Sequence, residues 1–215
     1  SDVSHELKTP ISVILAECEY TLQENRQTAV YIESLEIIQK QCMRTMSLIQ
    51  QLLQVSRTID KEKALDKENF SLSLLCESII DELTLMAEDN GVRLSSNIQK
   101  DIEIDADETL IMRMIINLLT NAIKYSRSCS NPKVELSLTK EDRIKIVIKD
   151  NGIGIKKEDQ ANIFRRFYKV DKSRTAEENS FGLGLAMVKW IAEAHNGEVS
   201  VKSELGEGSE FTVIL

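Results

Sequence analysis

The sequence predicts two domains of different fold class: an N-terminal all-α helical hairpin, which would form a four-helix bundle as a dimer, followed by an α+β sandwich. Three observations lead to this prediction. Apolar residues recur at helical spacing through residues 1–59, an almost entirely polar stretch occupies residues 60–69, and helical and alternating patterns are mixed through residues 70–215. We therefore predict an N-terminal helical domain, a linker and a C-terminal mixed domain with these three ranges.

The hairpin is predicted from two apolar stripes. The first helix covers residues 1–24, and its periodicity continues past Pro10, which predicts a bend near residues 6–10 rather than a stop. Residues 24–28 are polar and predict a turn. A second long amphipathic helix follows, with its stripe at Ile32, Leu35, Ile38, Cys42, Met46, Ile49, Leu52, Leu53 and Val55. One hairpin has too little partner surface to cover both stripes, so we expect a homodimer.

The C-terminal domain is predicted to mix helices with strands joined by short turns, which favours a mixed sheet covered by helices on one face. Helices are expected over residues 72–89, 108–125 and 185–195. Strands are expected over residues 92–98, 103–105, 133–139, 143–149, 198–203 and 209–215.

The composition excludes several classes of protein. A net charge of −8 without a long Lys/Arg stripe argues against nucleic-acid binding. No run approaches the roughly 18 apolar residues of a membrane span, so no membrane contact by this chain is expected. The four scattered cysteines predict reduced, mostly buried thiols of a cytoplasmic protein. Because the sequence begins abruptly inside a predicted helix, we expect it to be part of a longer protein.

The first chemical motif is the segment Ser4–Pro10 of the first predicted helix. His5 does not continue the apolar stripe, so we expect it to face solvent. A neutral imidazole is a competent nucleophile, and Glu6 could hold its other ring nitrogen. Thr9 lies one helical turn further on and could orient a water molecule. Taken alone, a surface histidine beside a glutamate is usually without function.

The second motif lies in the helix predicted over residues 108–125. Asn117, Asn121 and Lys124 recur at i, i+4 and i+7 and share one face. Amide oxygens are hard ligands suited to Mg²⁺, and the ammonium could contact a phosphate. The alternative is a solvated polar face, although two asparagines inside a helix run against intrinsic propensity.

Two glycine-containing segments complete the set. Asp150 ends a predicted strand before Gly152 and Gly154, where a carboxylate could accept from an exocyclic amino group while the glycines admit a flat ring; alone, this segment is an ordinary turn signal. Gly182, Leu183 and Gly184 lead directly into a helix whose N-terminus would favour a phosphate. The long, mostly polar segment 156–179 between them predicts a mobile lid.

In this order the four motifs resemble the H, N, G1 and G2 boxes of sensor histidine kinases, and Ile163–Tyr168 is similar to the F box. The resemblance covers nearly the whole chain. It implies a dimerisation and phosphotransfer domain followed by an ATP-binding domain of the Bergerat type, which gyrase and Hsp90-like ATPases share. One departure is Ser180-Phe181-Gly182, where the family usually has Gly-Thr-Gly, and it puts lid motion in doubt.

The resemblance also implies a role for each motif residue. His5 would be the phosphoacceptor, Glu6 its assisting base, and Thr9 a residue that helps water remove phosphate from a response regulator. The nucleotide would be ATP with Mg²⁺, and Asn121 would be the principal metal ligand, with Asn117 beside it. The implied ATP-binding residues are Asn117, Asn121, Lys124, Tyr125, Asp150, Gly152, Gly154, Lys169, Gly182, Leu183 and Gly184.

The function that follows is ATP-dependent autophosphorylation of His5 in a homodimer, then transfer to an aspartate on a receiver domain, with phosphatase activity toward that regulator a further option. The chain would be the cytoplasmic portion of a sensor with a membrane anchor. One alternative is an ATP-hydrolysing relative, which needs a carboxylate base where Asn117 stands. Another is a non-enzymatic scaffold with an inactive pocket.

Overall fold

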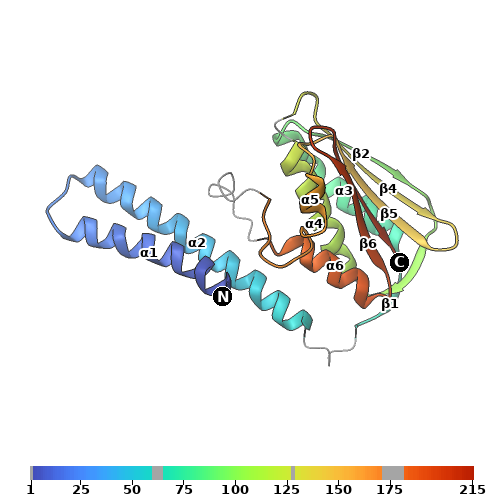
Figure 1. Cartoon of the computed structure of the whole chain (residues 1–215), viewed down its shortest axis with the longest axis horizontal. Helices are drawn as coiled ribbons and strands as arrows, with labels where there is room; N and C mark the ends of the chain where they lie inside the picture. Colours follow the sequence, from blue (N-terminus) through green and yellow to red (C-terminus); the bar gives the residue numbers. More distant parts are fainter. Residues whose placement is uncertain (1, 60–64, 127–128, 171–181) are drawn as a thin grey trace. The chain divides into compact units, whose positions relative to one another are not determined.

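The structure is a computed structural model that describes residues 2–59, 65–126, 129–170 and 182–215 (Figure 1). Side chains of residues 2–6, 47 and 50–59 are outside this description. The chain divides into two compact units, one built on a helical hairpin and one on β-sheets with packed helices. This arrangement of an all-α part before an α+β part is the predicted fold class.

The hairpin consists of α1 (Asp2–Leu22) and α2 (Thr28–Ile59). α1 continues through Pro10 without a break in helical assignment. At the turn, the Arg26 guanidinium lies 4.3 Å from the centre of the Tyr20 ring, and the Arg26 backbone N–H donates to the Tyr31 hydroxyl at 3.4 Å. These contacts fix the short connection between the two helices.

The hairpin leaves many large apolar side chains exposed. They lie at helical spacing on both helices, as a stripe of an unpaired amphipathic helix does. The exposed members are Ile11, Leu15, Ile32, Leu35, Met43, Met46 and Ile49. Exposed apolar side chains in this pattern are typical of an interaction surface.

The second unit contains a five-stranded sheet and a small two-stranded sheet. The larger sheet has the order β2-β4-β5-β7-β6; β2 and β4 pair in parallel, and the other neighbours are antiparallel. Its strands are β2 (Arg93–Ile98), β4 (Lys133–Lys140), β5 (Ile144–Asp150), β6 (Glu198–Glu204) and β7 (Gly208–Ile214). The small sheet pairs β1 (Glu68–Ser71) with β3 (Glu103–Ala106).

Three helices cover one face of the larger sheet: α3 (Leu72–Asp89), α4 (Glu108–Ser126) and α6 (Gly184–Ala194) (Figure 1). The strands alternate accordingly; in β5, Ile146 and Ile148 are buried while Lys145 and Lys149 are exposed. Period-two alternation with one solvated face is the usual pattern of an antiparallel sheet. The core therefore lies between this sheet and the three helices, and it holds α4 in place.

Two elements differ from the sequence prediction. β1 begins at Glu68, inside the range predicted as linker. It was not predicted because its mostly polar residues form a strand only through pairing with β3. The short helix α5 (Lys157–Gln160) lies inside the segment predicted as a continuous lid. Part of that segment, residues 171–181, lies outside the described residues.

The cysteines differ from the prediction of mostly buried thiols. Cys76 is buried, and burial raises its pKa to about 12, which makes it inert. Cys42 is exposed, and Cys18 and Cys129 are half-buried. Within the described ranges, no helix combines the length and the apolar character that crossing a bilayer requires.

Candidate functional site

The polar face of α4 carries the predicted amide pair. Asn117, Asn121 and Lys124 are partly exposed, whereas the opposite residues Ile115 and Leu119 are fully buried. The Asn117 side-chain NH₂ donates to the Arg113 carbonyl at 3.0 Å. This bond orients the amide, so its Oδ1 is directed away from the helix backbone and is available as a ligand oxygen.

The N-terminus of α6 lies against this face. A Cβ added at Gly184 would be 3.1 Å from Asn117 Oδ1 and 3.9 Å from Asn121 Nδ2. Gly182 has φ +70, a left-handed conformation that favours glycine, and Leu183 is buried. Glycine at position 184 therefore lets the start of α6, with its unpaired N–H groups, lie next to the two amides.

Asp150 ends β5 and is only 7% exposed. Its Oδ1 accepts hydrogen bonds from the backbone N–H of Gly152 at 2.8 Å and of Ser209 at 3.2 Å. Among the described residues, no donor reaches Oδ2. Burial raises the pKa of Asp150, and the two backbone hydrogen bonds offset part of that effect. The free carboxylate oxygen is a directed acceptor in a water-poor environment.

The turn after Asp150 contacts the C-terminal end of α4. The Ile153 N–H donates to the Tyr125 carbonyl at 3.2 Å, and a Cβ at Gly152 would be 2.7 Å from the same oxygen. Gly154 has φ +68, and a Cβ there would be 1.9 Å from the Glu204 carbonyl. Glycine is therefore required at both positions for the backbone to approach this closely.

These segments form one region of the sheet unit, because α4 contacts both the Asp150 turn and the start of α6. Tyr125 is exposed at the end of α4, and the Lys124 ammonium lies 5.2 Å from the centre of its ring. A buried acceptor, an aromatic ring, an ammonium group, amide oxygens and a helix N-terminus fit the adenine, phosphates and magnesium of a nucleotide. The residues present therefore fit a magnesium-bound nucleotide, and their individual roles stay predictions.

The segment from α5 to Lys169 is attached to the rest of the unit. The Gln160 side-chain NH₂ donates to the Ser203 carbonyl at 2.8 Å, and the Tyr168 hydroxyl donates to Asp159 at 2.5 Å. The hydrogen bond to Asp159 raises the pKa of Tyr168. Lys169 is half-buried, and its predicted phosphate contact stays a prediction.

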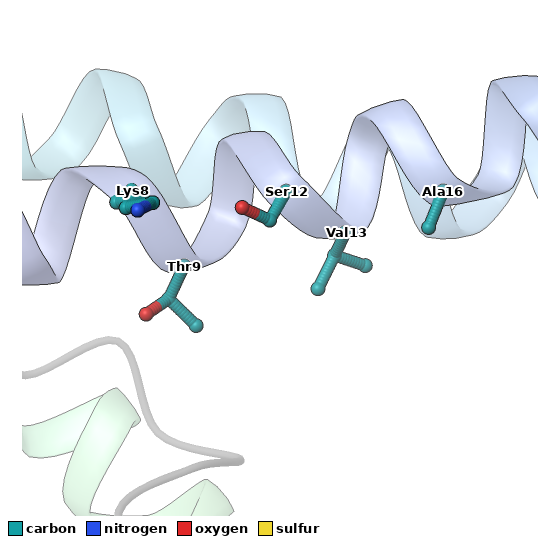
Figure 2. Close-up of a pocket in the computed structure, with 5 residues that line it drawn as sticks. All are labelled: Lys8, Thr9, Ser12, Val13 and Ala16. Carbon is teal, nitrogen blue, oxygen red and sulfur yellow. The ribbon is translucent and has the colours of Figure 1, made fainter.

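The predicted phosphoacceptor motif lies in α1. His5 and Glu6 belong to this helix, but their side chains are outside the described residues. Thr9 is exposed one turn further on. Figure 2 shows Thr9, Val13 and Ala16 on one side of α1, where a hollow of about 460 Å³ is lined by Lys8, Thr9, Ser12, Val13 and Ala16.

Two residues of the site were missed in the sequence. Ser209 is buried and supplies the second N–H to Asp150, and its hydroxyl lies 3.0 Å from that of Ser203. The Ser203 hydroxyl donates to the Gly208 carbonyl at 2.7 Å. Gly206 and Gly208, which flank the turn before Ser209, were the available signal, but they do not reveal the strand partner.

Comparison with known proteins gives matches over both units. The sequence model of the family "Histidine kinase-, DNA gyrase B-, and HSP90-like ATPase" matches residues 106–215. The model of the "His Kinase A (phospho-acceptor) domain" matches residues 1–60. The sensor-like histidine kinase SenX3 of Mycolicibacterium smegmatis is 31% identical over the whole chain, which spans 56% of that relative.

Two solved structures share the fold. Histidine kinase ThkA, in complex with the response regulator protein TrrA, has a TM-score of 0.76 at 21% identity; the match covers 99% of this chain and 59% of that one. Full-length ShkA in complex with AMPPNP has a TM-score of 0.73 at 22% identity, over 98% of this chain and 44% of that one. At this identity the two structures establish the fold alone.

Proposed function

Because the chain belongs to the sensor histidine kinase family, with a phosphoacceptor domain and a histidine kinase-, gyrase B- and Hsp90-like ATPase domain, we propose that it phosphorylates its own His5 from ATP. The main observation behind the proposal is that the turn after Asp150 and the start of α6 both contact α4, the helix that bears Asn117 and Asn121. The AMPPNP bound to ShkA supports a nucleotide ligand for this fold.

The nucleotide would bind through the residues of the sheet unit. Asp150 Oδ2 would accept a hydrogen bond from the adenine amino group, with Tyr125 beside the ring. Asn121 and Asn117 would hold Mg²⁺ through their amide oxygens, and Lys124, Lys169 and the start of α6 would neutralise phosphate charge. A bound Mg²⁺ ion supplies charge stabilisation for the triphosphate. Gly152, Gly154, Gly182, Leu183 and Gly184 would shape the pocket.

The reaction would transfer a phosphoryl group to a histidine nitrogen. A ring nitrogen of His5 forms a bond to the γ-phosphorus, the bond to the bridging oxygen breaks, and ADP leaves with the electron pair. Glu6 would hold the proton on the other ring nitrogen and accept it as positive charge develops. Transfer of this kind depends mainly on positioning and charge stabilisation.

The proposal includes two protein partners. The exposed apolar stripe of the hairpin, with Leu35 and Ile49 among its members, would be covered by a second copy in a four-helix bundle. The ThkA–TrrA complex supports a response regulator as the acceptor of the phosphoryl group. Thr9 would orient the water that removes phosphate from that regulator.

The proposed domains are residues 1–59 for dimerisation and phosphotransfer, 60–69 for the linker and 70–215 for ATP binding. The chain spans 56% of its relative SenX3. We therefore propose that it is the cytoplasmic catalytic part of a longer, membrane-anchored sensor.

Incubation of the chain with γ-labelled ATP and Mg²⁺ tests this function. We expect acid-labile, base-stable label on the protein, the signature of a phosphorylated histidine. His5→Gln should keep nucleotide affinity and lose the label, whereas Asn121→Ala should lose both. Release of inorganic phosphate without protein labelling would instead indicate an ATPase, and no Mg²⁺-dependent nucleotide binding would indicate a scaffold.

A further inference from the structure

Both ends of α6 contact α4. At its start, Gly184 lies against Asn117 in the middle of α4. Just after its end, His195 bonds to Asp107, the residue that precedes α4. The two helices are therefore antiparallel neighbours, and the position of α4 relative to α6 is defined at two points along the pair.

The hydrogen bonds of His195 define its tautomer. Nδ1 lies 2.8 Å from the Ile191 carbonyl, which can only accept, so Nδ1 carries the proton. Nε2 accepts the backbone N–H of Asp107 at 3.1 Å, so Nε2 carries none. Only the neutral ring satisfies both bonds. A protonated ring could not accept from Asp107.

Asp107 is the N-cap of α4. Its Oδ1 accepts the Leu110 N–H at 3.0 Å, which satisfies one of the unpaired donors of the first turn. In a capping box, a Glu or Gln at the third helical position accepts the N-cap's own N–H. Leu110 occupies that position and has no acceptor. His195, just after the end of α6, supplies the acceptor in its place.

The backbone that carries His195 is itself fixed to the sheet. Gly197 N–H donates to the Ala192 carbonyl at 2.7 Å, and a Cβ at Gly197 would be 2.3 Å from the Ile214 carbonyl. The Arg143 guanidinium donates to the Asn196 carbonyl at 2.9 Å. Asn196, between His195 and Gly197, has a left-handed φ of +58. The acceptor nitrogen is therefore presented from a rigid turn.

We propose that His195 is a positioning residue for metal-nucleotide binding: its neutral Nε2 completes the N-cap of α4 and so fixes the spacing between Asn117 and Gly184. This inference rests on the proposed function, because it treats the amide face of α4 as the magnesium site. The Asp150 turn is held by β5 and β7 and does not depend on this bond. His195 therefore affects the magnesium-dependent part of nucleotide affinity more than the magnesium-independent part.

The test compares His195→Gln with His195→Asn in the full chain. Gln can extend an amide oxygen to the Asp107 N–H, whereas Asn keeps only a donor for Ile191. Calorimetric titrations of ATP with and without Mg²⁺ give the gain in affinity due to the metal. We expect His195→Gln to keep this gain within about twofold. His195→Asn should reduce it by about threefold to tenfold, because one hydrogen bond is lost.

A second readout uses the nucleotide-free protein. Nitrogen NMR shifts should show the Nδ1-protonated tautomer of His195, and amide exchange at Asp107 should be slow in wild type and Gln but faster in Asn. Asn196→Ala is the control: it destabilises the same turn through its positive φ but leaves the Asp107 acceptor in place, so the metal gain should persist.

The outcomes separate the two proposals. If wild type binds Mg-ATP and the variants His195→Asn and His195→Gln behave alike in both measurements, the proposed role of His195 is wrong. If Asn196→Ala reduces the metal gain as much as His195→Asn, the effect is general destabilisation and the inference also fails. If wild type shows no metal gain, the proposed function fails, whereas the exchange and tautomer measurements still decide whether His195 caps α4.

Discussion

Asp150 and Ser209 face each other in the register of β5 and β7, and the Ser209 N–H donates to Asp150 Oδ1 at 3.2 Å. Together with Gly152, this bond directs one carboxylate oxygen to the backbone and leaves the other for a ligand. The cost is a buried charge, because burial raises the pKa of this carboxyl group. Burial of this carboxylate therefore costs stability, as is common for side chains that bind ligands.

Asp150→Asn should therefore separate stability from binding. The amide oxygen of Asn can accept both backbone N–H groups, and the buried charge is removed, so the free energy of unfolding should stay equal or rise at neutral pH. Nucleotide affinity should fall by at least about tenfold, because an NH₂ group would face the adenine amino group. Urea unfolding and ATP titration measure the two effects.

The stability difference between wild type and Asp150→Asn should depend on pH, because the pKa of Asp150 is raised in the folded wild type. The folded state binds the proton more tightly than the unfolded state, so stability falls as pH rises from the ordinary carboxyl pKa through the raised one. At neutral pH the wild type should therefore have a lower free energy of unfolding than Asp150→Asn. This difference should disappear as pH falls from the raised pKa to the ordinary carboxyl pKa. A deficit that grows on acidification would show that the carboxylate is stabilised, not penalised, by folding.

Gly184→Ala tests the close approach of α6 to α4. Alanine is favoured over glycine in a helix by roughly 0.5–1 kcal/mol, so the unfolding free energy should not fall much. The added Cβ would be 3.1 Å from Asn117 Oδ1 and should displace that oxygen, which we propose as a magnesium ligand. Weaker Mg²⁺-dependent nucleotide binding is expected, and unchanged binding would mean that Asn117 is not part of the metal site.

Leu35→Lys tests the dimer surface of the hairpin. Leu35 is 63% exposed, and a charge there should oppose burial against a second copy. Leu85→Lys is the matched control, because Leu85 on α3 is 67% exposed but lies outside the hairpin. Light scattering should give a monomer for the first variant and a dimer for the second. A dimeric Leu35→Lys would place the interface elsewhere.

Lys149→Glu tests a row of alternating charges across the solvated face of the sheet. Lys149 pairs in register with Glu135 on β4 and Glu210 on β7, so the substitution places three like charges side by side. A loss of roughly 0.5–2 kcal/mol in unfolding free energy is expected from two such pairs. Lys140→Glu makes the same charge change opposite Ile144 and should cost less; equal losses would point to net charge instead.

Local patterns were sufficient for most helices and strands. The helix predicted over residues 72–89 has those bounds as α3, because a clear apolar periodicity ends at Gly91. β1 was missed because its partner β3 lies more than thirty residues later in the sequence. Strand pairing of this kind depends on tertiary contacts that composition does not encode.

The site shows the same division. The amide face of α4 and the carboxylate of Asp150 were visible as spacing and strand-end chemistry. Ser209 and His195 were not, because each acts through a hydrogen bond to a residue far away in sequence. Their roles depend on which backbone N–H group the fold places beside them, and the spacing of residues in the sequence does not predict this.

If the proposed function holds, phosphate from ATP reaches His5. The most direct measurement is mass-spectrometric mapping of the phosphorylated residue after incubation with Mg-ATP, with peptides kept at alkaline pH to preserve phosphohistidine. We expect a single modified site, at His5 in the peptide from α1. Stable phosphate on Ser4 or Thr9, or on His195, with His5 unmodified, would contradict it.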